Sequence, residues 1–300
     1  MTVPAPILVF VFNRLEHTRL TVHALQKNLL SLESDLIIFS DGPRRESDIP
    51  AVKEVRKYLS SLKGFKSVQI IERDRNFGLA NSVIDGVTQI VNRFGKVIVV
   101  EDDLVTSPYF LRYMNEALEK YEHEEQVISI HGYSYPTAKP LPETFFLRGA
   151  DCWGWATWKR GWELFEPDSK KLLRQLKEKN LQHRFDFDGT YGYMKMLREQ
   201  ISGKVDSWAV RWHASAFLLE KLTLFPGRSL VNNIGEGESG THTKSLTDFR
   251  TSVAQTPIVL NDIPIVENQE ARQAYVEFFR SVRSSLPRRA LNKLRSLFST

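Results

Sequence analysis

The chain has almost no cysteine, since Cys152 is the only one in 300 residues. A disulfide within the chain is therefore excluded, as is a metal site built from several thiolates. Long apolar runs are also missing. The first apolar segment, Pro6 to Phe12, is far shorter than the roughly 20 residues that span a membrane, and no basic region precedes it. Secretion is not indicated, and we expect a cytoplasmic protein.

Two common phosphate-binding loops are absent as well. A dinucleotide-binding domain has a glycine-rich turn directly after its first strand, whereas the first apolar run here is followed by Asn13-Arg14-Leu15-Glu16. No Walker-type loop with its lysine occurs in the sequence. Any nucleotide must therefore be held chiefly by a metal ion and by side chains.

Acidic residues are missing from the end of the chain. From Arg280 to Thr300 there are six basic residues and no acidic one, which exceeds the net charge of +5 of the whole chain. We expect a helix from about Gln269 to Ser284, a break at Pro287, and a short helix with an apolar side formed by Ala290, Leu291, Leu294, Leu297 and Phe298. This pattern is typical of an interfacial membrane anchor and equally of a terminal helix that docks on its own domain, so both interpretations stay open. No nucleic-acid-binding module accompanies the basic residues.

Apolar strands alternate with amphipathic helices in the first hundred residues. The expected strands are 6–12, 36–40, 68–71 and 95–100, with helices between them. This order predicts an α/β fold with a mostly parallel central sheet flanked by helices, and such sheets bind ligands beyond the carboxyl ends of their strands. The polar side chains at those ends are Asn13, Arg14, Asp41 and the run Glu101-Asp102-Asp103.

Three consecutive acids end the fourth expected strand. Side chains alternate along a strand, so Glu101 and Asp103 share one face and Asp102 takes the other. Adjacent carboxylates repel one another, and a hard divalent ion with oxygen ligands from acids, water and phosphates relieves that repulsion. The run therefore predicts a metal-phosphate site. The alternative is that these acids merely solvate a strand end.

The second half of the chain is rich in aromatic residues, and all six tryptophans lie between positions 153 and 212. The helical spacing of Trp155, Trp158 and Trp162 favours core packing on one face of a helix. The other three, Trp153, Trp208 and Trp212, are candidates for stacking on a sugar ring.

Two polar residues of this half also have two interpretations each. Asp206 precedes a segment that we expect to be helical, so it either caps that helix or faces an acceptor as a lone carboxylate, and these roles can coexist. The glycine-rich segment 232–242 predicts a mobile loop that ends at His242. That histidine is either a metal ligand or a solvated loop residue.

Together these residues resemble the GT-A fold of nucleotide-sugar glycosyltransferases, and in particular the N-acetylglucosaminyltransferase I family. In that family a Glu-Asp-Asp sequence follows an apolar strand, as Glu101-Asp102-Asp103 does here. The resemblance implies that Asp103 binds the metal ion, that Asp102 faces the ribose or nucleotide, and that Glu101 faces the donor sugar. It also implies base recognition by Asp41 and, beside Asn13, a phosphate contact by Arg14.

Three shorter matches lie in the second half. Trp153-Gly154-Trp155 resembles the family's Gly-Trp segment, and Asp206-Ser207-Trp208 resembles an Asp-Asp-Trp element, with one acid replaced. Residues 229–235 resemble the start of the donor-closing loop. The resemblance thus implies Asp206 as catalytic base, with Trp153 and Trp208 on the acceptor side.

The resemblance implies metal-dependent, inverting transfer of a sugar from a nucleoside diphosphate sugar to a glycan or lipid-linked hydroxyl. The implied donor is UDP-linked, and the implied cofactor is Mn²⁺ or Mg²⁺. Residues 1–106 would bind the donor, 107–245 the acceptor, and 246–300 would form an extension that contacts the inner face of the membrane. Because no membrane stem precedes the domain, the chain resembles a bacterial enzyme of surface polysaccharide synthesis. A sugar-nucleotide nucleotidyltransferase and a non-catalytic carbohydrate-binding protein are the alternatives, and a retaining mechanism stays open.

Overall fold

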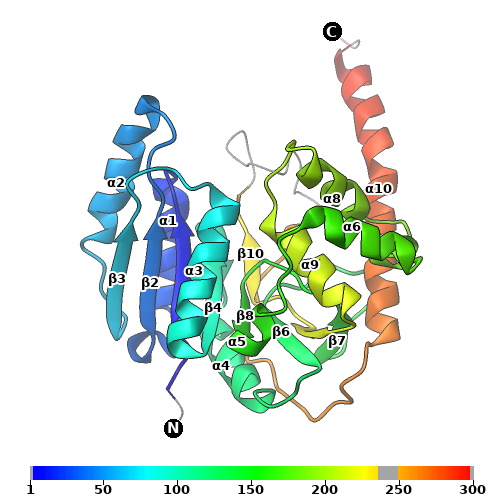
Figure 1. Ribbon diagram of the computed structural model, residues 1–300, viewed down its shortest axis with the longest axis horizontal. Helices are drawn as coiled ribbons and strands as arrows, with labels where there is room; N and C mark the ends of the chain where they lie inside the picture. Colours follow the sequence, from blue (N-terminus) through cyan, green and yellow to red (C-terminus); the bar gives the residue numbers. More distant parts are fainter. Residues whose placement is uncertain (1–2, 236–248, 298–300) are drawn as a thin grey trace.

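A mixed eight-stranded sheet forms the centre of the molecule (Figure 1). The computed structural model describes residues 3–235 and 249–297, with side chains described up to Arg283. The strands lie in the order β3-β2-β1-β4-β8-β6-β9-β7. Their bounds are β1 Ile7–Val11, β2 Asp35–Ser40, β3 Ser67–Glu72, β4 Lys96–Glu101, β6 Val127–His131, β7 Thr144–Arg148, β8 Trp155–Trp158 and β9 Leu222–Pro226.

The first four strands along the chain form one parallel part of this sheet. Strands β3, β2, β1 and β4 are mutually parallel, and β6 is parallel to β9. Strand β8 is antiparallel to both β4 and β6, and β7 is antiparallel to β9. The predicted α/β fold with a mostly parallel central sheet is therefore confirmed.

Helices cover both faces of the sheet. Their bounds are α1 Leu15–Gln26, α2 Ile49–Leu59, α3 Leu79–Phe94, α4 Phe110–Lys120, α5 Lys159–Trp162, α6 Ser169–Glu178, α7 Gln182–Phe185, α8 Tyr193–Ile201, α9 Trp208–Leu218 and α10 Gln269–Leu297. The pleat of β1 divides the core, because Ile7 and Val9 pack with residues of α1, α2 and α4, whereas Leu8 and Phe10 pack with residues of α3 and α9. Figure 1 shows α3 in front of the parallel strands.

The tryptophans form much of the core on the α3 side. Trp155 and Trp158 lie in strand β8 and not in a helix, so the predicted helical arrangement is wrong, although all three residues of that set are buried. Trp155 and Trp158 lie in β8 and Trp162 lies in the short helix α5 that follows directly, so a strand and a helix together give the same three- and four-residue spacing as one helix. The Trp155 ring stacks on Trp208 with centroids 5.3 Å apart and packs against Trp212 at 5.9 Å. These contacts hold α9 against the sheet.

The end of the chain is one continuous helix, α10, which the structure traces through Pro287 without the predicted break. A proline removes one hydrogen bond from a helix, and here the helix continues past it. Tyr275, Phe278 and Phe279 of α10 are buried in the main core, which anchors the first part of the helix. In the described residues no helix is both long and apolar enough to cross a membrane.

Two histidines are buried in the second half. His131 ends β6 and is 0% exposed, while His213 of α9 lies so close to Gly149 that a Cβ there would be 2.5 Å from the imidazole. Burial lowers the pKa of each ring from 6.5 to about 4. Both rings are therefore neutral at neutral pH.

Acid is expected to destabilise the fold through these two rings. The unfolded chain binds more protons than the folded chain between pH 6.5 and about 4, so the stability that the neutral rings contribute is complete above pH 6.5 and is lost as the pH falls toward 4. At pH 5 we expect each ring to lower the free energy of unfolding by about 2 kcal/mol relative to pH 7. Urea unfolding at both pH values measures this loss. His213→Gln should remove about half of it, and an unchanged pH dependence in that variant would contradict the assignment.

Candidate functional site

The sheet brings Arg14 and the acidic run to one edge. Strands β1 and β4 are neighbours, and their register places Phe10 opposite Glu101. The turn after β1 contains Arg14 and the half-buried Asn13, while Asp102 and Asp103 follow β4. Because β1 connects to β2 on one side and pairs with β4 on the other, this is the point of an open sheet at which ligands bind.

Arg14 bridges two of the three acids. Its Nε donates a hydrogen bond to Asp102 Oδ2 at 3.2 Å, and its Nη2 donates to Asp103 Oδ2 at 2.9 Å and also to Asp102 Oδ1. The hydroxyl of Thr21 in α1 donates to the Asp102 backbone carbonyl at 2.8 Å. In this conformation the Arg14 guanidinium binds the acids themselves, and the phosphate contact expected of it stays a prediction.

The cluster carries more negative than positive charge. Burial raises the pKa of Glu101, and the charges of Asp103 and Asp102 raise it further. Burial also raises the pKa of Asp102, against the opposing effect of Arg14. Conversely, burial alone would lower the pKa of Arg14, but the charges of Asp102 and Asp103 and their hydrogen bonds raise it above its usual value. A further cation beside these acids would therefore be favoured.

The acidic cluster suits a divalent ion that takes only one or two protein ligands, such as Mg²⁺ or Mn²⁺. Within residues 3–235 and 249–297, no three His, Cys, Asp or Glu side chains are grouped as an all-protein metal site. The Asp103 side chain keeps 14% of its surface exposed and accepts one hydrogen bond from Arg14, whereas that of Asp102 keeps 7% and accepts two. Magnesium and manganese commonly use one or two carboxylates and complete their shell with water and phosphate oxygens. The residues present fit an ion held in that way by Asp103.

A second, two-stranded sheet lies next to Asp103. Strand β5, Leu104–Thr106, follows the acids and pairs antiparallel with β10, Val231–Asn233. The backbone N–H of Ile234 donates to the Asp103 carbonyl at 2.8 Å, and a Cβ at Gly235 would lie 2.3 Å from Asp103 Oδ2. Only glycine fits at position 235 with the carboxylate in this place. His242, the other expected metal ligand, lies outside the described residues.

Asp41 is buried at the carboxyl end of β2, where it holds a neighbouring loop. Its Oδ1 accepts hydrogen bonds from the backbone N–H groups of Gly42 at 3.0 Å and Phe77 at 2.8 Å, and its Oδ2 accepts one from Gly78 at 3.0 Å. The Asn76 side chain donates to the Gly42 carbonyl at 2.9 Å. Asp41 thus fastens the loop after β3 beside the ends of β1 and β2, and base recognition by its carboxylate stays a prediction.

No function was predicted for the loop after β3, residues 73–78. The Arg73 guanidinium lies 4.3 Å from the centroid of the Phe77 ring and 4.9 Å from that of Phe39, and it also pairs with Asp85. The loop follows a strand end, as the other candidate residues do, and that position was the available signal. Its contact with Asp41 depends on tertiary structure and is not visible in the sequence.

Asp206 lies at the start of α9 near this loop. A Cβ at Gly78 would be 3.7 Å from its Oδ2, which places it by the first turn of α3. Its side chain is 57% exposed and is 3.7 Å from Arg211 Nη2. The helix is capped by Ser207, whose hydroxyl accepts from the Val210 N–H at 3.3 Å, so the capping role that we considered for Asp206 is wrong.

The tryptophans expected at the acceptor side differ in exposure. Trp208 is 2% exposed and stacked on Trp155, and Trp212 is 0% exposed, so neither ring presents a face to a sugar. Helix α9 is apolar on nearly all sides, and both rings are buried in the core that it shares with the sheet and α3. Trp153 is half-buried, edge-on to Tyr133 with centroids 4.8 Å apart. Trp153 alone of these three keeps part of its ring accessible.

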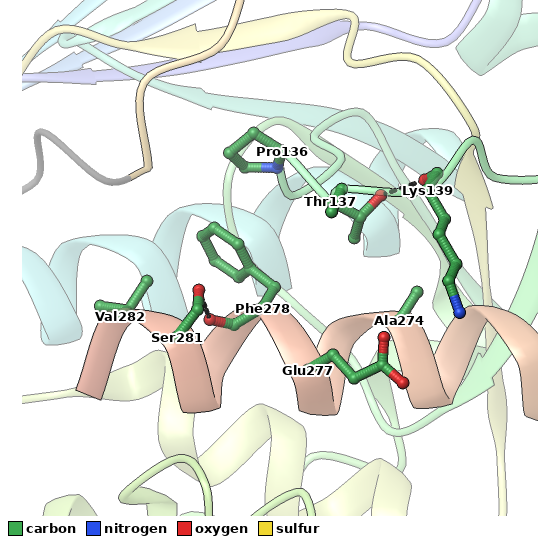
Figure 2. A pocket seen from close by; sticks show the side chains of 9 residues that line it. Pro136, Thr137, Lys139, Ala274, Glu277, Phe278, Ser281 and Val282 are labelled. Carbon is green, nitrogen blue, oxygen red and sulfur yellow. Dashed lines mark hydrogen bonds between the residues drawn. The ribbon is translucent and has the colours of Figure 1, made fainter. Parts of the chain in front are cut away.

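A cavity of about 350 Å³ lies elsewhere, between the loop 136–139 and helix α10. Figure 2 shows Pro136 and Phe278 on opposite sides of it, with Lys139 and Glu277 toward one end. None of the expected site residues lines this cavity. It is therefore separate from the acidic edge of the sheet.

The mixed sheet with helices on both faces has the architecture expected of the GT-A fold, and the acids lie at its β1–β4 edge. The family model of glycosyl transferase family 2 matches residues 7–201, which is more than half of the chain, and the chain belongs to this family. The narrower resemblance to the N-acetylglucosaminyltransferase I family stays a prediction.

Two solved structures are similar to this chain at a low level. S. aureus TarS is 13% identical with a TM-score of 0.30, and the match covers 48% of this chain and 24% of TarS. The mannosyltransferase PcManGT from Pyrobaculum calidifontis, solved in complex with GDP-Man and Mn²⁺, is 10% identical with a TM-score of 0.35. The match covers 72% of this chain and 71% of that one. Likenesses this weak say nothing about the substrate here. No curated protein matches the chain.

Proposed function

We propose that this protein is a metal-dependent, inverting glycosyltransferase that moves a sugar from a nucleoside diphosphate sugar, UDP-linked, to a hydroxyl of a glycan or lipid-linked acceptor in bacterial surface polysaccharide synthesis. One observation carries the proposal. Three acids stand against one arginine at the β1–β4 edge of the sheet, with the Asp103 side chain still 14% exposed. Burial raises the pKa of Glu101 to about 8, so the negative charge at neutral pH lies chiefly on the two aspartates, and a cation that would in turn bind a diphosphate would balance it.

Each residue at this edge of the sheet would have its own role in binding the metal ion and the donor. Asp103 would hold Mn²⁺ or Mg²⁺, and when bound the ion would neutralise charge on the leaving diphosphate. Arg14 adds positive charge at the same edge, and Asp102 fixes its orientation through two hydrogen bonds. Glu101 lies on the face of Val97 and Val99, toward α3, where a donor sugar would lie.

Transfer also needs a carboxylate that takes the proton of the acceptor hydroxyl. The family resemblance implies Asp206 for this role, and the side chain of Asp206 is 57% exposed and lies near Gly78. Trp153 supports an acceptor with a sugar ring, because this residue is only half-buried. Contact with a membrane through α10 belongs to the same proposal.

A thermal-shift screen tests the proposal. Nucleotide sugars that bind the folded state stabilise it by mass action and so raise its melting temperature. At a ligand concentration of a hundred times Kd, the free energy of unfolding rises by about 2.7 kcal/mol. We expect one nucleoside diphosphate sugar to raise it strongly with Mn²⁺ and weakly with EDTA. Stabilisation by simple glycosides but by no nucleotide would instead favour a carbohydrate-binding protein.

A further inference from the structure

The loop that leads into β8 passes beside the acidic run. Strand β8 is antiparallel to β4, with Val99 opposite Trp155. Directly before β8, a Cβ at Gly154 would lie 2.7 Å from a methyl group of Val231 in β10, the strand that pairs with β5 after the acidic run, so Asp151 and Cys152 pass near the end of β4. Burial and the charges of Asp151, Glu101 and Asp103 raise the pKa of the Cys152 thiol, which is consistent with a position between these acids.

The Asp151 carboxylate is fixed but not enclosed. Its Oδ2 accepts a hydrogen bond from the Tyr135 hydroxyl at 2.9 Å, and its Oδ1 accepts one from the Cys152 N–H at 2.8 Å. The side chain keeps 17% of its surface exposed. A carboxylate has about four lone-pair positions, so these two bonds leave capacity for a hydroxyl donor.

A buried histidine with unmet hydrogen-bonding capacity lies behind this carboxylate. His131 is 0% exposed, and neither of its ring nitrogens has a hydrogen-bond partner in the described part of the chain. Its Nε2 is 3.8 Å from Asp151 Oδ2, too far for a hydrogen bond. Burying an unpartnered polar group is unfavourable, and each such group calls for an explanation.

The surroundings suit a carbohydrate. Trp153, two residues from Asp151, is half-buried with its ring edge-on to Tyr133. Tyr191 is also half-buried, and the negative charge of Asp151 acts on its hydroxyl together with burial to raise its pKa. Amphipathic aromatic rings beside a carboxylate can pack on the apolar face of a sugar while the acid receives its hydroxyl.

We propose that Asp151, and not Asp206, binds the reacting hydroxyl of a carbohydrate acceptor and takes its proton. The O–H bond of the acceptor breaks and its proton passes to the Asp151 carboxylate, while the acceptor oxygen forms a bond to the anomeric carbon of the donor. The bond from that carbon to the phosphate oxygen breaks, and its electron pair leaves with the nucleoside diphosphate. This inference rests on the proposed function.

The test compares Asp151→Asn with Asp206→Asn and with Asp262→Asn, a control that removes a remote, fully exposed carboxylate. Each variant is assayed for release of nucleoside diphosphate from the donor found in the thermal-shift screen. Water is the acceptor in one series and octyl glycosides in the other. Nucleoside diphosphate with Mn²⁺ is titrated calorimetrically into each protein to show that the donor side is intact.

General acid–base groups typically contribute 10²- to 10⁴-fold to the rate. We expect Asp151→Asn to lower kcat by at least about 100-fold in both series, with nucleotide affinity within about twofold of wild type, while Asp206→Asn loses less than about tenfold. A change confined to the acceptor KM, a loss only in Asp206→Asn, or turnover within about threefold of wild type in Asp151→Asn would overturn the inference. If the wild-type protein turns over no donor, the proposed function fails and this inference with it.

Discussion

Asp103→Asn is expected to abolish metal-dependent donor turnover while the protein stays folded. The carboxamide has nearly the same shape but lacks the charge, and the Asp103 carboxylate is the more exposed of the two that Arg14 contacts. Losing one preorganised electrostatic group typically lowers kcat by about 10²- to 10³-fold, or roughly 3 kcal/mol. We expect a loss of at least that size.

The stability of Asp103→Asn should not fall together with its activity. Asp103 raises the pKa of both Glu101 and Asp102 through repulsion, so removing its charge relieves part of that repulsion. We expect a melting temperature equal to or slightly above that of wild type without ligand. Nucleoside diphosphate release and calorimetry with Mn²⁺ measure the loss of function, with Asp262→Asn as the matched control. Full turnover in Asp103→Asn would refute the metal-site assignment.

Arg14→Met is expected to destabilise the fold strongly. The substitution keeps an unbranched apolar stem but removes the guanidinium that bridges Asp102 and Asp103. Breaking a buried ion pair by removing one partner typically costs 3–5 kcal/mol. Because the Arg14 side chain keeps 21% of its surface exposed, we expect about 2–4 kcal/mol in the free energy of unfolding.

Two comparisons separate charge from packing in that result. Arg14→Lys keeps the charge and loses the two-pronged hydrogen bonding, so its loss should be roughly half as large. Mn²⁺ with nucleoside diphosphate should restore more stability to Arg14→Met than it adds to wild type, because a second cation then balances the acids. Urea unfolding with and without these ligands measures both. Equal stability of Arg14→Met and wild type would show that the ion pair contributes nothing to the fold.

Local patterns predicted the donor side of the fold well. Apolar β-branched runs alternate there with amphipathic helices, and strands β1, β2, β3 and β4 all lie where those runs predicted them. The edge at which Arg14, Asp41 and the acidic run gather followed from the rule that parallel strands present their carboxyl ends together. Periodicity and chain order were sufficient for this part.

The second half depended on contacts between distant residues. The spacing of Trp155 and Trp158 fits a helix as well as a strand followed by a turn of helix, and only pairing with β4 and β6 decides between them. Trp208 carries an amphipathic ring directly after the polar residues Asp206 and Ser207, but the apolar surroundings of α9 bury it. No local pattern distinguishes such a ring from an exposed one.

The hydrogen-bond partners within the site were equally hidden. Asp41 follows a strand end and so was expected to face a ligand, yet its oxygens accept backbone N–H groups from Phe77 and Gly78, more than thirty residues away. Arg14 was expected to contact phosphate, and it binds the acids that lie beside it across the β1–β4 pair. Residue type and strand position predicted where these side chains gather but not which of them pair.

The central claim is that Asp103 holds a metal ion carrying a nucleoside diphosphate at the β1–β4 edge. Crystals grown with Mn²⁺ and the nucleoside diphosphate selected by the screen, measured for anomalous scattering, test it most directly. The account predicts a manganese peak within about 2.2 Å of an Asp103 carboxylate oxygen, with diphosphate oxygens completing its shell. A nucleotide bound away from this edge, or a manganese ion with no contact to Asp103, would contradict it.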